Sequence, residues 1–220
     1  MYKGQGDINM DALDKLAADL EGQGVTALAR RCDVSSEADC KAMVDTAVEQ
    51  FGRLDMAVNN AGIAHGFIPI HELTGELLDQ QMNVNVKGVM FGMKHQIPAM
   101  KASGGGAIVN TASINGLSPG NMQGIYSISK AAVISMTKSF AMECAEFNVR
   151  VNALLPGLTK TKFAGALFQQ EEIYKSAIAQ IPMHRHAEPK EMAGTVLYLV
   201  SDASSYVTGE CVVVDGGFTI

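Results

Sequence analysis

Short apolar runs alternate along this chain with longer amphipathic stretches, and this alternation limits the possible folds more than any other feature. In residues 10–21, apolar side chains recur at the i, i+3, i+4 and i+7 spacing of a helix. Strands separated by helices of this length predict right-handed crossovers and a parallel sheet covered on both faces, so we expect the α/β class. The other expected helices are residues 36–51, 74–101, 126–146 and 189–201, and the expected strands are residues 25–31, 54–59, 107–112, 149–155 and 210–215.

Composition predicts one compact domain over residues 1–220, because 47% of the residues are hydrophobic and 18% are charged. No apolar run approaches the roughly 20 residues of a membrane span, so no membrane partner is expected. The first residues lack the basic and apolar regions of a secretory signal, which favours a cytoplasmic location. A net charge of −6 without a basic stripe argues against a nucleic-acid partner.

The four cysteines and the His184–His186 pair do not indicate a metal site or a disulfide. Cys32, Cys40, Cys144 and Cys211 form no CxxC pair, and we interpret them as buried thiols. Two histidines spaced by two on a loop are more typical of a solvated turn than of metal ligands. No metal is therefore expected.

Small and polar residues follow four of the expected strands. They are Asp33, residues 59–62 (Asn-Asn-Ala-Gly), residues 111–113 (Thr-Ala-Ser) and residues 156–161 (Pro-Gly-Leu-Thr-Lys-Thr). Ordinary turn chemistry explains any one of these segments, but it explains poorly why all four directly follow an expected strand. Because ligands of open α/β sheets bind beyond the carboxyl ends of the strands, these segments predict a binding site.

Tyr126 and Lys130 are spaced by four residues, which places both side chains on one face of a helix with Cβ atoms about 5 to 6 Å apart. A phenol titrates near 10, and a neighbouring ammonium lowers its pKa by charge attraction. Ser113 at a strand end offers a hydroxyl that can hold a substrate oxygen near the phenol. The three residues together predict a centre for general acid/base chemistry.

These residues carry a resemblance to a known family. Residues 59–62, Ser113, the Tyr126-Ser-Ile-Ser-Lys130 segment, Pro156-Gly157 and the closing residues 201–217 together resemble the short-chain dehydrogenase/reductase superfamily. The resemblance runs from about residue 7 to residue 220 and implies a Rossmann-like doubly wound sheet. It also implies hydride transfer between NAD or NADP and a secondary alcohol or ketone.

The resemblance implies a role for each matching residue. Tyr126 is expected to be the general acid/base, Lys130 to lower its pKa and hold the nicotinamide ribose, and Ser113 to position the carbonyl. Asn85 matches a fourth catalytic position, where a helix kink holds a water that links Lys130 to solvent; the alternative is an ordinary polar residue on a helix. The expected cofactor-binding residues are Asp7, Asp33, Val34, Asn59, Ala61, Gly62, Tyr126, Lys130, Pro156, Gly157, Thr159 and Thr161.

The N-terminal part departs from the family pattern. Family members open with a strand and a glycine-rich turn that bind the pyrophosphate, and no such segment is present, since Gly4 and Gly6 follow no expected strand. Asp7 resembles the acid at the end of the second strand of family members, which favours NAD over NADP. Most of the strand that would precede Asp7 is expected to be missing. We favour a truncated enzyme; alternatively, residues 25–31 pair beside residues 54–59, or a partner chain covers the apolar edge of residues 54–59.

Two further expectations concern substrate and assembly. Residues 161–183 are expected to form an apolar flap or, alternatively, a plain surface helix. An apolar pocket for a neutral alicyclic or aromatic alcohol or ketone is expected to be lined by His65, Phe67, Ile68, Ile114 and Asn115. The two long helices resemble those with which family members form homodimers and homotetramers. The alternative function is a noncatalytic oligomer-forming subunit, or a fragment with impaired cofactor binding.

Overall fold

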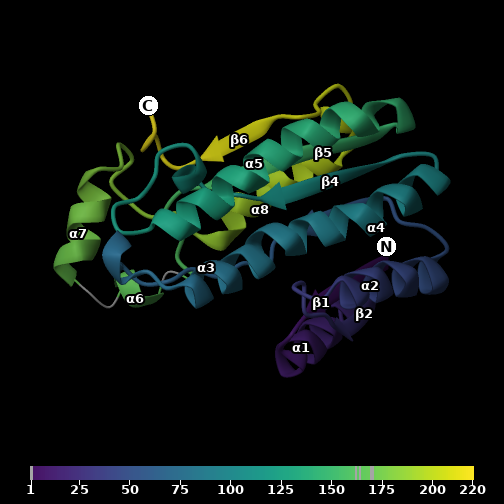
Figure 1. The fold of residues 1–220 in the computed structure, drawn as a ribbon. Coiled ribbons are helices and arrows are strands. Elements are labelled where there is room, and N and C mark those ends of the chain that lie inside the picture. Colours follow the sequence, from purple (N-terminus) through teal and green to yellow (C-terminus); the bar gives the residue numbers. More distant parts are fainter. Residues whose placement is uncertain (1, 162, 164, 169–170) are drawn as a thin grey trace.

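The strands form two separate parallel sheets in the structure, a computed structural model that describes residues 2–161, 163, 165–168 and 171–220 (Figure 1). One sheet has the order β1-β2 and the other has the order β3-β4-β5-β6, with every pair parallel. The strands are β1 (Tyr2–Asp7), β2 (Thr26–Arg31), β3 (Met56–Asn59), β4 (Gly106–Thr111), β5 (Val149–Pro156) and β6 (Cys211–Val214). The α/β class with parallel pairing is therefore confirmed.

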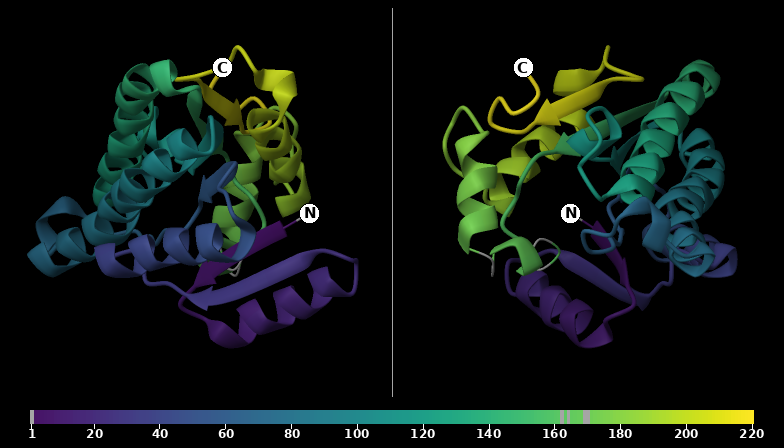
Figure 2. Two further views of the ribbon diagram at one scale, coloured as in Figure 1. Left: turned by 90° about the vertical axis from the view of Figure 1, so that its right-hand side faces the viewer. Right: turned by 60° about the vertical axis from the view of Figure 1, so that its left-hand side comes forward.

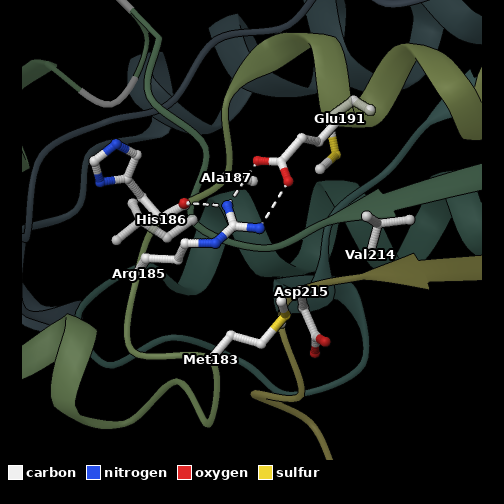
Figure 3. A pocket seen from close by; sticks show the side chains of 10 residues that line it. Met183, Arg185, His186, Ala187, Glu191, Val214 and Asp215 are labelled. Atoms are coloured by element: carbon white, nitrogen blue, oxygen red, sulfur yellow. Dashed lines mark hydrogen bonds and ion pairs between the residues drawn. The ribbon is translucent and has the colours of Figure 1, made fainter.

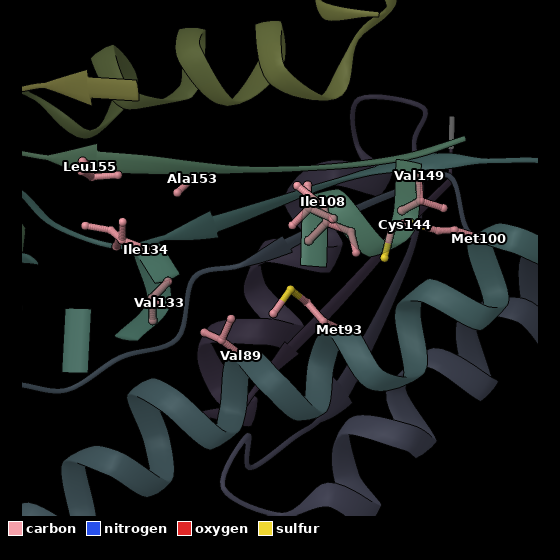
Figure 4. Packing of buried hydrophobic residues seen from close by; sticks show 13 residues of the cluster. Val89, Met93, Met100, Ile108, Val133, Ile134, Cys144, Val149, Ala153 and Leu155 are labelled. Atoms are coloured by element: carbon pink, nitrogen blue, oxygen red, sulfur yellow. The ribbon is translucent and has the colours of Figure 1, made fainter. Parts of the chain in front are cut away.

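Helices cover both faces of the larger sheet. They are α1 (Met10–Glu21), α2 (Glu37–Phe51), α3 (Gly75–Gln81), α4 (Gly88–Ala102), α5 (Gly124–Cys144), α6 (Gly165–Phe168), α7 (Glu171–Ala179) and α8 (Pro189–Val200). Helices α4 and α5 lie on one face and α8 lies on the other (Figures 1 and 4). Among the described residues, no helix has both the length and the apolar character that crossing a membrane requires.

The main core lies between this sheet and the helices α4 and α5 (Figure 4). Val149, Val151 and Leu155 of β5 are fully buried against Val133 of α5 and Met93 of α4. Burying a side chain of this size stabilises the fold by about 1.5 to 3 kcal/mol, so this layer holds the carboxyl ends of β4 and β5 rigidly in place.

The N-terminal residues correct one expectation, because residues 2–7 form the strand β1 and its parallel pairing with β2 spans all six residues of each strand. The expectation that most of this strand is missing was wrong. Glycine suits this strand because a Cβ on Gly6 would lie only 3.1 Å from Cβ of Cys32. The ring of Tyr2 stacks on Phe51 of α2, with ring centres 5.2 Å apart.

The strand β2 does not move beside β3, since its partner is β1. Within the described residues β3 pairs only with β4, and Met56 and Val58 on β3 are 54% and 46% exposed. The expected exposed apolar edge of this strand is thus present. Helix α2 packs against α4 and bridges the two sheets; Glu37 of α2 forms an ion pair there with Lys94 of α4.

The long helix expected over residues 74–101 is interrupted. A π-helical segment, Met82–Lys87, separates α3 from α4. Asn85 lies within this segment and is fully buried. The wider turn is the helix kink that the resemblance implied at this position.

Candidate active site

The structure brings Tyr126, Lys130 and Ser113 together at the carboxyl end of β4. Tyr126 and Lys130 lie one turn apart on α5 and are 8% and 3% exposed. Ser113 follows β4 in extended backbone; its hydroxyl accepts from the backbone N–H of Asn115 at 3.2 Å and lies near enough to the phenol of Tyr126 to oppose the rise of its pKa. The predicted proximity of the phenol, the ammonium and the serine hydroxyl is therefore present in the fold.

Burial dominates the ionisation of this site. It raises the pKa of Tyr126, and the nearby hydroxyl of Ser113 opposes this rise only in part. Burial is thus the largest influence on the pKa of Tyr126 in the unliganded chain, and the effect of the Lys130 charge on this pKa stays a prediction. Burial also lowers the pKa of Lys130 to about 8.

Lys130 is held by a backbone carbonyl. Its Nζ donates to the carbonyl oxygen of Thr111 at 2.8 Å and lies 5.7 Å from the ring centre of Tyr126. One of the three ammonium hydrogens is thus committed, and two remain for another acceptor. Thr111 is a residue that sequence reasoning did not single out for this contact, because a backbone carbonyl leaves no signal in the residue type.

Asn85 lies beside the same site. Its Oδ1 accepts from the backbone N–H of Ile63 at 2.8 Å, and its Nδ2 donates to the carbonyl of Ile63 at 2.8 Å. A Cβ on Gly62 would lie 3.4 Å from both Asn85 Oδ1 and Lys130 Nζ. The Asn85 amide and the Lys130 ammonium therefore flank the same glycine.

In residues 59–62, which end β3 and follow it, one side chain points into the protein and another is exposed to solvent. The side chain of Asn59 turns into the protein and bonds Gln96 of α4 and Asn110 of β4. This amide is engaged in structural bonds, so only the backbone of Asn59 remains for a ligand. Ala61 is exposed and Gly62 is half-buried next to Lys130.

Asp7 and Asp33 lie at the carboxyl ends of β1 and β2, which are neighbours in the small sheet. The carboxylate of Asp7 is exposed and accepts from the N–H of Asn9 at 2.9 Å. Asp33 accepts from the N–H and hydroxyl of Ser35. Val34 packs against α4, since a Cβ on Gly88 would lie 2.8 Å from its Cγ2.

The segment after β5 runs close to the end of β6. The N–H of Gly157 donates to Val214, and a Cβ on Gly157 would lie 2.7 Å from Cα of Asp215, so a side chain there collides with backbone. Thr159 bridges to Ala187, and its hydroxyl donates to the carbonyl of Gly157. Pro156 is half-buried at the end of β5, while Thr161 is exposed.

The region of the expected flap contains α6 and α7 and touches the site through Phe163, whose ring centre lies 5.9 Å from that of Tyr126. Among the expected pocket residues, His65 is buried, and its Nε2 has no hydrogen-bond partner among the described residues. Phe67 is 46% exposed.

A cavity of about 130 Å³ lies beside the segment after β5, and Figure 3 draws the side chains that line it. Arg185 forms two hydrogen bonds of 2.8 Å with Glu191 across it (Figure 3). Sequence reasoning did not single out this ion pair, because the six-residue spacing crosses a turn into α8. The cavity is lined by Leu158, Met183, Arg185, His186, Ala187, Glu191, Met192, Val214, Asp215 and Gly216, so the candidate catalytic residues do not line it.

The geometry at the strand ends accepts a nicotinamide dinucleotide. Lys130 keeps two ammonium hydrogens that can donate to hydroxyl groups, and Gly62 lies next to it without a side chain. The turn from β1 into α1 consists of Ile8 and Asn9 and contains no glycine. The described residues thus offer contacts for the ribose and nicotinamide ends, whereas this turn is not a phosphate-binding one.

Comparison with known proteins decides the family. A family model described as enoyl-(acyl carrier protein) reductase matches residues 5–219. The 2,5-dichloro-2,5-cyclohexadiene-1,4-diol dehydrogenase of Sphingobium indicum is 40% identical over 217 residues, which cover 97% of this chain and 85% of that protein. The chain belongs to the short-chain dehydrogenase/reductase (SDR) superfamily.

Solved SDR structures share the fold of this chain. NAD⁺-bound xylitol dehydrogenase matches it with a TM-score of 0.94 and 31% identity, covering 98% of this chain and 88% of that one. A gluconate 5-dehydrogenase from Burkholderia cenocepacia, in complex with NADP and tartrate, also gives a TM-score of 0.94, with 28% identity and coverage of 98% and 84%. This SDR is therefore an NAD(P)-dependent oxidoreductase with a Rossmann-type fold.

Proposed function

We propose that this SDR transfers a hydride between NAD(P) and a secondary alcohol or ketone, with Tyr126 as the general acid/base. The observation that carries the proposal is that the hydroxyl of Ser113 and the phenol of Tyr126 are buried close together, one helical turn from the buried ammonium of Lys130. A substrate oxygen that bonds both hydroxyls lies within reach of the phenolic proton. The nicotinamide, when bound, supplies or accepts the hydride.

Tyr126 acts as an acid in ketone reduction. Because burial raises its pKa, the phenol holds its proton at neutral pH, and this is the form that can donate to a carbonyl oxygen. In alcohol oxidation the phenol must first lose this proton, and the nearby charge of Lys130 favours the phenolate that results. Ser113 keeps the substrate oxygen in place in both directions.

Asn85 is proposed to hold a water that links Lys130 to solvent. The amide of Asn85 is fixed by the backbone of Ile63, and its Oδ1 accepts one hydrogen bond there, which leaves a second lone pair. That oxygen and the Lys130 ammonium flank Gly62. These contacts support a polar path that restores the proton of the acid/base centre.

The proposed cofactor contacts extend over both sheets. Asp33, Val34, Ala61 and Gly62 are assigned to the adenosine half and Pro156, Gly157, Thr159 and Thr161 to the nicotinamide half, with only the backbone of Asn59 contributing. NAD is proposed as the preferred form because the exposed Asp7 carboxylate can accept from both ribose hydroxyls and repels a 2′-phosphate. The similar xylitol dehydrogenase is NAD⁺-bound, whereas the gluconate dehydrogenase holds NADP.

The proposed substrate is a neutral alicyclic or aromatic alcohol or ketone. Phe163 beside Tyr126 offers an apolar surface at the reacting end, and the flap over residues 161–183 is proposed to close over it. The name of the similar cyclohexadiene-diol dehydrogenase also points to a ring-bearing alcohol. The chain is proposed to act in the cytoplasm as a single-domain subunit of a homodimer or homotetramer; Met142 on α5, 83% exposed, suits such an interface.

A noncatalytic oligomer-forming subunit remains the second candidate function. The observations that favour it are the glycine-free turn after β1 and the exposed apolar side chains of Met56 and Val58 on β3. In this alternative the catalytic residues persist, but the dinucleotide binds too weakly to support turnover.

Turnover of cyclic secondary alcohols with NAD⁺ or NADP⁺, and of the matching ketones with the reduced cofactors, tests the proposal. The same assay is run on a variant with a strand and a glycine-rich turn joined ahead of the chain, and calorimetry measures cofactor binding by both. Turnover that depends on Tyr126 supports the oxidoreductase. Absence of turnover in both proteins would reject it, and micromolar NAD⁺ binding by the unextended chain would reject the noncatalytic alternative.

A further inference from the structure

Ser129 lies between two of the proposed catalytic groups and is completely buried. Its hydroxyl donates to the backbone carbonyl of Tyr126 at 2.7 Å, and it accepts from Nδ2 of Asn85 at 3.0 Å. The hydroxyl therefore connects the helix that bears Tyr126 and Lys130 to the π-helical segment that bears Asn85.

The direction of these bonds, like that of the two bonds with the backbone of Ile63, is compatible with only one orientation of the Asn85 amide. A serine hydroxyl has one proton, and the carbonyl of Tyr126 takes it, so towards Asn85 the oxygen can only accept. The Nδ2 group must then face Ser129, which turns Oδ1 towards the N–H of Ile63 and the Gly62 side of the site. With the amide reversed, two acceptors would face each other at Ser129 and two donors at the Ile63 N–H.

We infer that Ser129 is a positioning residue that, together with the backbone of Ile63, holds the orientation of the Asn85 amide, and through it the polar path that ends at Lys130. The inference rests on the proposed function for its kinetic consequence, but the orientation itself is a property of the unliganded chain. Loss of the Ser129 hydroxyl removes the acceptor for one Nδ2 hydrogen and leaves only the two bonds with Ile63 to hold the amide in place.

Ser127 provides a matched control. It lies two residues earlier on the same helix and is also buried, at 4% exposure, but its hydroxyl has no hydrogen-bond partner among the described residues. Ser127→Ala and Ser129→Ala thus remove the same atoms from similar depth, and only the second breaks the contact with Asn85.

The first measurement is the hydrogen exchange of the Asn85 side-chain amide, followed by NMR in the unliganded protein and assigned with Asn85→Ala. We expect Ser129→Ala to accelerate this exchange about tenfold, the order of one buried hydrogen bond, while Ser127→Ala leaves it unchanged. Equal exchange in the two variants would overturn the inference. If Ser129→Ala does not fold, Ser129→Cys keeps the size of the side chain with a weaker acceptor, and the same acceleration is expected.

The second measurement is a double-mutant cycle in turnover. Ser129→Ala is expected to lower kcat about tenfold with KM unchanged, and to have almost no further effect in an Asn85→Ala background, because both changes break one path. Additive losses would show that Ser129 does not act through Asn85. A parent chain without turnover would reject the proposed function alone, since the amide exchange still tests the orientation.

Discussion

The two sheets of this molecule differ sharply in burial. In the larger sheet, Val149, Val151 and Leu155 of β5 are fully buried between helical layers. In the smaller sheet, β1 is exposed at all its residues except one half-buried position, and β2 is at most half-buried. The smaller sheet also lies apart in Figure 2, where β1 and β2 run below the rest of the molecule with α1 beneath them.

This difference separates the site into a rigid and a less supported half. Ser113, Tyr126 and Lys130 stand at the end of the buried sheet, and the groups proposed to bind the adenosine half of the cofactor stand partly on the exposed one. Local stability follows buried apolar contact, so the acid/base centre is expected to be firmly preorganised and the adenosine end less so.

The largest effect is expected from Tyr126→Phe, which removes only the phenolic oxygen from the rigid half. Turnover is expected to fall about 10³-fold, within the range of general acid/base catalysis, while cofactor affinity stays nearly unchanged. Steady-state kinetics and calorimetric cofactor binding measure the two quantities. Equal turnover in parent and variant would show that Tyr126 is not the acid/base.

A pair of leucine truncations compares the two sheets directly. Leu155 is fully buried in β5, whereas Leu28 in β2 is half-buried. Leu155→Ala is expected to lower the free energy of unfolding by about 3 kcal/mol and Leu28→Ala by about 1 kcal/mol, because a buried truncation adds a cavity to the lost transfer energy. Urea denaturation provides the values; a larger loss at Leu28 would reverse the comparison.

A smaller, pH-dependent effect is expected at Lys130. Its pKa is about 8 in the folded protein and about 10.4 in an unfolded chain. Between these values the unfolded chain binds a proton that the folded one does not, so raising the pH through this window stabilises the fold.

The free energy of unfolding of the parent, relative to Lys130→Met, should therefore rise from pH about 8 to about 10 and stay level below this window. Denaturation at several pH values measures it. A relative stability that falls over the same range would contradict the depressed pKa.

Much of the fold could be predicted from local patterns. The helix α1 begins and ends as its periodicity indicated, with Asn9 accepting from Ala12 at the N-terminus, and Ser36 caps α2 in the same way. The proximity of Tyr126 and Lys130 follows from helical spacing alone. Ser113 could be included because it follows a buried strand, and the fold brings strand ends to one edge.

Other structural features could not be predicted, because they leave no pattern in the local sequence. The strand β1 has the sequence YKGQGD, which is polar, exposed and rich in glycine, so it shows no apolar alternation. The π-helical segment around Asn85 depends on contacts with Ile63 and Ser129, which lie far away in the chain. The inward turn of Asn59 likewise depends on Gln96 and Asn110, so the residue type alone suggested a ligand contact.

The claim that Ser113 and Tyr126 form one proton-transfer centre is tested most directly by titrating Tyr126. NMR of the protein carrying ¹³C-labelled tyrosine, with Tyr126→Phe for assignment, gives this pKa in the absence of cofactor. We expect a pKa above the ordinary value of about 10 in the parent and a higher one still in Ser113→Ala, because burial raises the pKa of Tyr126 and the serine hydroxyl opposes that rise. An ordinary pKa that Ser113→Ala leaves unchanged would contradict it.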